Sequence, residues 1–194
     1  MKNEIIRPVL ALPNNYKSLL LHSCCAPCSC EIMGTLKLSS IDFTIFFFNP
    51  NIDTLDEYNL RKEENKKFAL KLNIPFYDGD YNYQSWLNSV KGLEAEPERG
   101  KRCTKCFSYR LEETAKFAVK NRFKIFTSSL GISRWKDFNQ VCECGTKAAS
   151  KYNLTYWNHN WRKKGGSERM STISKKENFY RQNYCGCSFA KYNK

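Results

Sequence analysis

The segment KSLLLHSCCAPCSC, Lys17–Cys30, places four thiols directly behind a short apolar run. The run Lys17–His22 is almost continuously apolar, which is typical of a strand buried on both faces of a parallel sheet. The first three of the four thiols follow at the carboxyl end of this strand. We expect the chain to turn there at Pro27 into a helix that starts near Ser29.

The same alternation of strand and helix continues outward along the chain. Further short apolar or aromatic runs that predict strands are Asp42–Phe48, Ile74–Asp78, Lys124–Ser129 and Leu154–Asn158. The stretches between them that predict helices are Asp53–Leu72, Cys103–Asn121 and Trp135–Tyr152. The pattern predicts one α/β domain over residues 1–194, with a three-layer parallel sheet and a ligand or metal site at the carboxyl ends of the strands.

The composition narrows the class of protein. No apolar run is long enough to span a bilayer, and the first residues lack the continuous apolar centre of a signal sequence. We therefore expect a cytoplasmic protein without a membrane partner, in which ten cysteines indicate a metal, a cluster or a redox couple rather than disulfides. The formal charge of +13 favours nucleic acid as a partner.

Seven cysteines form three groups. Cys24, Cys25 and Cys28 follow the first strand, Cys103 and Cys106 begin a helix with a spacing that puts both thiols on one face, and Cys185 and Cys187 flank a glycine. A tetrahedral zinc site closes with four ligands, so seven thiols imply a larger centre or two sites. Iron-sulfur, zinc and metal-free redox thiols all remain open from spacing alone. The remaining thiols, which we interpret as small buried or surface residues, are Cys30, Cys142 and Cys144.

Other side chains are candidates for substrate contacts. Tyr58 and Arg61 lie on the stripe that a helix would turn inward, and Arg61 either pairs with a nearby glutamate or binds an anion beside the thiols. Tyr58 and Asp137 are candidate proton donors, together with Tyr184. The segment WNHNWRKKGGSERM mixes tryptophans and positive charge around glycines, which predicts an RNA contact unless its tryptophans belong to the core. Its named residues are Trp157, Trp161, Arg162, Lys163, Lys164 and Arg169.

These pieces together resemble the cobalamin-independent epoxyqueuosine reductase family, QueH. The resemblance covers most of the chain and rests on motifs in the family's order: HSCCAPC, NPNI with EYNLR, CTKCFSYRLEETA, SSLGISRWKD and YRQNYCGC. Two positions depart from the pattern, since many members have a proline where Arg134 stands and some have an aspartate where Cys28 stands. Cys142 and Cys144 match no family motif.

The resemblance implies a HUP-like α/β fold and an iron-sulfur oxidoreductase that reduces the epoxide of epoxyqueuosine at the wobble position of tRNA, the last step of queuosine synthesis. It implies that Cys24, Cys25, Cys103 and Cys106 hold a 4Fe-4S cluster. It further implies a redox-active pair, Cys185 and Cys187, and an additional adjacent iron with Cys28 among its ligands. The partners would be the tRNA and an electron donor protein or reductant.

Two rival functions follow from the same residues. An ATPase of the related α/β superfamily needs a glycine-rich phosphate loop after the first strand, where this chain has SCCAPC instead. A zinc-stapled RNA-binding module without redox activity would explain the charge and four of the thiols, but it leaves three of the grouped thiols unused.

Overall fold

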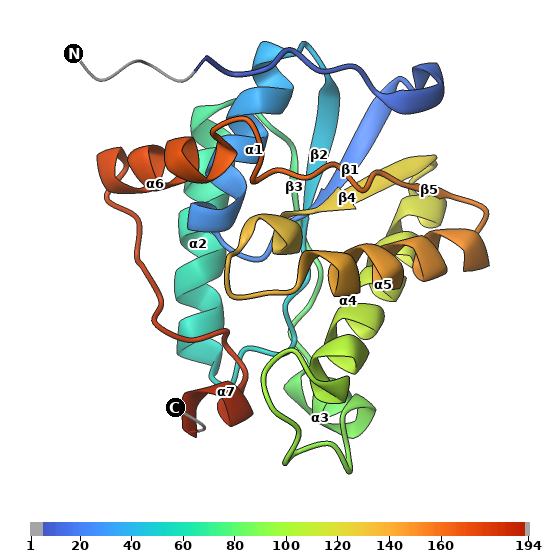
Figure 1. Ribbon diagram of the computed structural model, residues 1–194, viewed down its shortest axis with the longest axis vertical. Coiled ribbons are helices and arrows are strands. Elements are labelled where there is room, and N and C mark those ends of the chain that lie inside the picture. Colours follow the sequence, from blue (N-terminus) through green and yellow to red (C-terminus); the bar gives the residue numbers. More distant parts are fainter. Residues whose placement is uncertain (1–5, 193–194) are drawn as a thin grey trace.

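A computed structural model describes residues 6–192. It contains a sheet of five parallel strands in the order β3-β2-β1-β4-β5, with β1 at the centre (Figure 1). This confirms the predicted α/β class and the parallel sheet. The strands are β1 (Ser18–His22), β2 (Asp42–Phe47), β3 (Phe76–Asp78), β4 (Ile125–Ser128) and β5 (Thr155–Tyr156).

Helices connect the strands, and none of the described helices is both long and apolar enough to cross a membrane. The three long helical patterns of the sequence correspond to α2, α4 and α5, and the sequence did not predict α3, α6 or α7. The helices are η1 (Pro13–Asn15), α1 (Ala26–Leu38), α2 (Leu55–Lys71), α3 (Tyr83–Ser89), α4 (Lys101–Lys120), η2 (Ser129–Ile132), α5 (Phe138–Lys151), α6 (Gly166–Lys176) and α7 (Ser188–Tyr192).

The starts of α1 and α5 differ most from the prediction, whereas those of α2 and α4 differ less. α1 begins at Ala26 rather than near Ser29, because a proline is well tolerated in the first turn, where its missing N–H has no helical partner. α5 begins at Phe138 rather than Trp135, because Asp137 is its N-cap and accepts a hydrogen bond from the Gln140 backbone at 2.8 Å. The residues before Asp137 are therefore a loop, which leaves their backbone carbonyls available for other partners.

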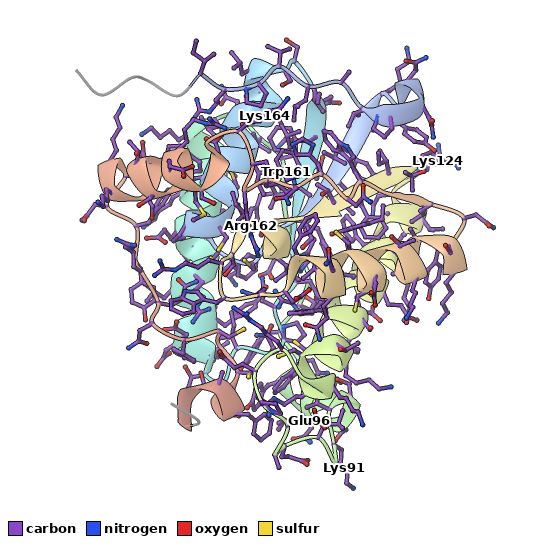
Figure 2. The ribbon with its side chains drawn as sticks, in the orientation of Figure 1. Lys91, Glu96, Lys124, Trp161, Arg162 and Lys164 are labelled. Carbon is purple, nitrogen blue, oxygen red and sulfur yellow. The ribbon has the colours of Figure 1, made fainter. Side chains whose placement is uncertain are left out.

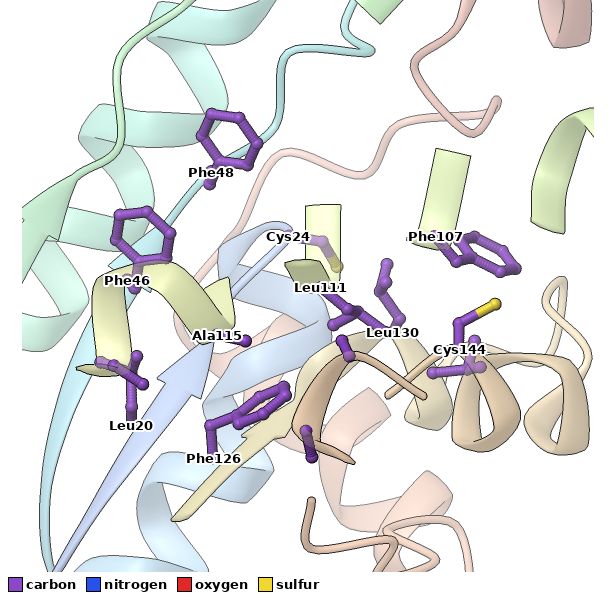
Figure 3. Packing of buried hydrophobic residues seen from close by; sticks show 14 of the residues in the cluster. Leu20, Cys24, Phe46, Phe48, Phe107, Leu111, Ala115, Phe126, Leu130 and Cys144 are labelled. Atoms are coloured by element: carbon purple, nitrogen blue, oxygen red, sulfur yellow. The ribbon is translucent and has the colours of Figure 1, made fainter. Parts of the chain in front are cut away.

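The core lies on both faces of the sheet, and successive residues of β1 alternate between the two faces. Leu20 packs with Phe126 and with Leu111 of α4 on the face that α4 and α5 cover (Figure 3). Leu19 and Leu21 pack on the opposite face with side chains of α1, α2 and α6. The fold thus has the three layers that the sequence predicts, and β1 is buried on both sides.

The segment WNHNWRKKGGSERM, which the sequence predicts as an RNA contact, is partly helical. α6 begins at Gly166, where an added Cβ would lie only 1.9 Å from the carbonyl oxygen of Trp161. Glycine is therefore required there for a close backbone approach rather than for flexibility. Trp161 itself is only 5% exposed, so it belongs to the core and cannot serve as a stacking surface for RNA.

Candidate metal centre and active site

The first thiol group lies where β1 ends and α1 begins. The Cys24 backbone N–H donates to Ser129 Oγ at 2.9 Å, which joins the carboxyl ends of β1 and β4. The sulfur atoms of Cys24, Cys25 and Cys28 all lie within 4.8 Å of one another. Gln182 Nε2 donates to Cys25 Sγ at 3.1 Å and brings the C-terminal segment to the same place. Three sulfurs at this separation form a potential metal-binding group.

The protonation of these three thiols is linked. Hydrogen bonds from Cys25 and then Cys28 lower the pKa of Cys24, and burial opposes this effect. The same hydrogen bonding to the Cys24 thiolate raises the pKa of Cys25, to about 12, and that of Cys28. One negative charge is therefore stable in the group, whereas three thiolates require a bound cation to neutralise them.

The other two thiol groups reach the same place. A cavity of about 390 Å³ is lined by one thiol from each group: Cys28, Cys103 and Cys185. Behind it, Cys106 and Cys187 are buried in a small cluster with Trp86. Burial raises the pKa of Cys103 to about 11 and that of Cys187 to about 12. The tertiary structure thus brings one thiol from each of the three sequence groups to a single cavity.

Two positive charges that the sequence pattern did not predict as site residues face the thiols. Arg110 is 2% exposed and donates to Asn49 Oδ1. Burial raises the pKa of Cys106, and the charge of Arg110 opposes this rise and also favours the Cys24 thiolate. Lys136 lines the cavity, and its charge also favours the Cys24 thiolate. Within residues 6–192 neither cation has a carboxylate at salt-bridge distance. Cys106 and Arg110 are four residues apart on one helix, a spacing that puts both side chains on the same face, so the sequence could have predicted that Arg110 lies beside a thiol.

The predicted substrate contacts of α2 lie away from the cavity lining. Tyr58 is 1% exposed, and its hydroxyl donates to Asp78. Arg61 is 3% exposed, pairs with Glu57 through Nε at 2.7 Å, and donates through Nη1 to the Cys185 carbonyl oxygen at 3.3 Å. Arg61 therefore holds the backbone of the third thiol group. Tyr58 is part of the core.

Of the predicted contacts outside α2, Tyr184 lines the cavity, whereas Asp137, Arg162, Lys163 and Lys164 do not. Asp137 is exposed and caps α5. Arg162 donates to two backbone carbonyls of the loop before α5, whereas Lys163 and Lys164 are exposed. In Figure 2, Arg162 lies near the centre of the view and Lys164 lies nearer its upper edge. The charged residues that do line the cavity are Glu98, Arg99, Arg134, Lys136 and Arg181.

The three cysteines interpreted as small structural residues lie within helices, away from the cavity lining. Cys30 is buried in α1, and its thiol donates to the Pro27 carbonyl oxygen at 3.3 Å. Cys144 is 3% exposed in α5 and accepts a hydrogen bond from Ser108 Oγ at 3.4 Å. Cys142 is partly buried in the same helix. Their helical positions agree with a packing role.

A family profile described as "Epoxyqueuosine reductase QueH" matches residues 19–193. The chain belongs to the QueH family. A protein named epoxyqueuosine reductase QueH from Histophilus somni (strain 129Pt) is 58% identical to it, over 95% of this chain and 76% of that protein. A protein of the same name from Acinetobacter baylyi (strain ATCC 33305 / BD413 / ADP1) is 57% identical, over 93% of this chain and 84% of that protein.

A more distant QueH protein, from Thermotoga maritima (strain ATCC 43589 / DSM 3109 / JCM 10099 / NBRC 100826 / MSB8), is 34% identical over 89% of this chain and 90% of its own length. The match thus extends over nearly the whole length of both proteins. As a member of this family, the chain shown in Figure 1 is an oxidoreductase that reduces epoxyqueuosine to queuosine in tRNA. The comparison confirms the resemblance expected from the sequence motifs.

Proposed function

We propose that this QueH protein performs the reduction with an iron-sulfur centre at the carboxyl ends of β1 and β4. Four thiolates, those of Cys24, Cys25, Cys103 and Cys106, would hold a 4Fe-4S cluster, which takes four such ligands. The observation that carries the proposal is that one thiol from each of three sequence groups lines a single cavity. A parallel sheet of this order, with its site at the strand ends, also supports the HUP-like class.

The donors and charges around the cavity fit such a centre. Neighbouring thiols can all ionise only beside bound cations, and the buried Arg110 has no carboxylate partner within the described chain. A thiolate-bound cluster carries net negative charge, which would compensate Arg110 and Lys136. When bound, the cluster would supply electrons one at a time. Cys28 is left available as a ligand to an additional adjacent iron.

Cys185 and Cys187 would act as a dithiol. Removing an epoxide oxygen as water leaves the alkene and consumes two electrons and two protons. Oxidation of two thiols to a disulfide releases the same two electrons and two protons, so the two half-reactions balance. Cys185 lines the cavity and Cys187 is buried behind it. An electron donor protein or a small reductant would then restore the dithiol after each turnover.

The tRNA would present its wobble base to this cavity. A base in an anticodon loop is already partly unstacked, so inserting it costs less than flipping a base out of a duplex. Exposed Lys163 and Lys164 remain candidates for phosphate contacts, and Asp137 and Tyr184 remain candidate proton donors near the cavity. Arg61 remains a candidate anion-binding residue through its position next to the third thiol group.

The experiment that tests the proposal is a measurement of iron, acid-labile sulfide and zinc in protein purified without oxygen. We expect about four sulfides with four or five irons per chain. Cys103→Ser should lose the cluster, whereas the matched variant Cys142→Ser should keep it. Cys28→Ser should keep the sulfide and lose at most the additional iron. One zinc with no sulfide would support the zinc-stapled module and overturn the iron-sulfur proposal.

A further inference from the structure

The loop between η2 and α5, residues 133–136, is held by two arginines from distant parts of the chain. Arg162 Nη2 donates to the carbonyl oxygens of Ser133 and of Lys136, the latter at 2.8 Å. Arg99 donates through Nε to the Trp135 carbonyl oxygen and through Nη2 to the Arg134 carbonyl oxygen, both at 3.1 Å. Four consecutive carbonyls are thus fixed, which makes an exposed loop rigid.

This rigid loop presents a large aromatic side chain at the cavity. Trp135 lines the cavity and is 64% exposed, whereas Trp86 and Trp161 are buried and Trp157 is partly buried. The guanidinium of Arg134 lies 4.7 Å from the centre of the Trp135 ring, so it covers one face of the indole. The opposite face is the one left for a flat partner.

The charges of the cavity lining select the kind of partner. Four cations line it, Arg99, Arg134, Lys136 and Arg181, against one acidic residue, Glu98. None of Arg134, Lys136 and Arg181 forms an ion pair within residues 6–192. An aromatic ring among unpaired cations matches the bases and phosphates of single-stranded nucleic acid. The cavity of about 390 Å³ falls within the usual range for a small ligand site.

We infer that Trp135 stacks on an anticodon-loop base next to the modified nucleoside while that nucleoside occupies the cavity, with Arg134 and Arg181 at the flanking phosphates. Arg99 and Arg162 are positioning residues that hold the loop. This inference rests on the proposed cavity as the site of reduction. It changes the role expected of Arg162, from a direct RNA contact to a residue that fixes Trp135.

The test measures the dissociation constant of holoenzyme for full-length tRNA carrying epoxyqueuosine, together with kcat and KM. Stacking of one base is worth about 1–3 kcal/mol, so Trp135→Ala should weaken binding and raise KM roughly 5- to 150-fold. The value of kcat should stay within about threefold, and Trp135→Phe should restore most of the binding. The matched control is Tyr77→Ala, which removes a 49% exposed aromatic side chain of β3 that does not line the cavity.

The variant Arg162→Gln distinguishes a positioning role of Arg162 from a direct contact with phosphate. If it fixes the loop, the effect of Arg162→Gln on binding is not additive with that of Trp135→Ala. If it contacts phosphate independently of the loop, the two effects add, which contradicts the positioning role. A dissociation constant for Trp135→Ala equal to that of the wild type would overturn the stacking inference, even with normal turnover. A cluster-loaded wild-type protein that binds the tRNA but does not reduce it would instead overturn the proposed function.

Discussion

Gly186 lies between the two cysteines of the third thiol group. Its replacement by alanine should make that segment detach more often from the rest of the fold. Its φ is +115°, a conformation that L side chains rarely adopt. An added Cβ would lie 3.1 Å from Arg61 Nη1 and 3.2 Å from Ile52 Cγ1. Arg61 cannot move away freely because Glu57 binds it, and the Gly186 carbonyl oxygen also accepts from the Asp53 backbone at 2.9 Å.

The size of the effect follows from these contacts. Backbone strain of this kind costs about 1–3 kcal/mol, and loss of one backbone hydrogen bond adds about 1 kcal/mol. A penalty of about 2–4 kcal/mol shifts the equilibrium for local opening by roughly 30- to 900-fold. Because the segment forms no strand of the sheet, we expect it to detach while the sheet stays folded.

The assay is the rate at which Cys187 reacts with an alkylating reagent in metal-free protein, followed by mass spectrometry. Cys187 is 6% exposed, so it reacts through the open state, and its rate should rise by that factor in Gly186→Ala. The matched control is Gly92→Ala, which has φ +81° but nothing within 4 Å of the added Cβ. A wild-type rate in Gly186→Ala, or an equal acceleration in Gly92→Ala, would refute the reasoning.

Two further predictions concern single side chains. Arg110→Gln should reduce the iron that the protein retains under a chelator challenge, without lowering the melting temperature of the metal-free protein, because a buried cation without a carboxylate partner mainly stabilises bound thiolates. Arg110→Lys should retain more iron than Arg110→Gln. Equal iron retention in the wild type and Arg110→Gln would contradict this role. Asp137→Ala should lower the free energy of unfolding, measured by urea titration, by about 1 kcal/mol, because α5 loses its N-cap. Asp137→Asn should lower it less. A large fall in kcat at unchanged stability would instead show that Asp137 takes part in the reaction.

The class of fold and the thiol groups could be predicted from the sequence because both depend on local patterns. An almost continuously apolar run such as residues 18–22 is typical of a strand covered on both faces, and the alternation with helical stretches favours a parallel sheet. Cys24 and Cys25 had to follow the end of that strand. Seven thiols in three groups indicated a larger centre or two sites, and their spacing left iron-sulfur, zinc and metal-free redox thiols open.

The tertiary structure decided which residues form the site. Arg162 and Trp161 looked like RNA contacts because they stand in a basic segment with glycines, yet Trp161 is buried and Arg162 binds the carbonyls of another loop. Arg61 was expected either to pair or to bind an anion, and it pairs with Glu57 while holding the Cys185 carbonyl. Such roles depend on which backbone groups lack partners, which a linear pattern does not show.

The sequence by itself therefore determined the parallel sheet, the position of the first thiols at its edge and the family motifs. Only the tertiary structure decided that Cys28, Cys103 and Cys185 line one cavity, that Arg110 is buried beside the thiols, and that Trp135 stands exposed on a loop held by two arginines. The physical reason is the range of the interactions. Strand and helix patterns depend on neighbours a few residues away, whereas cavities and buried charges depend on residues that only folding brings together.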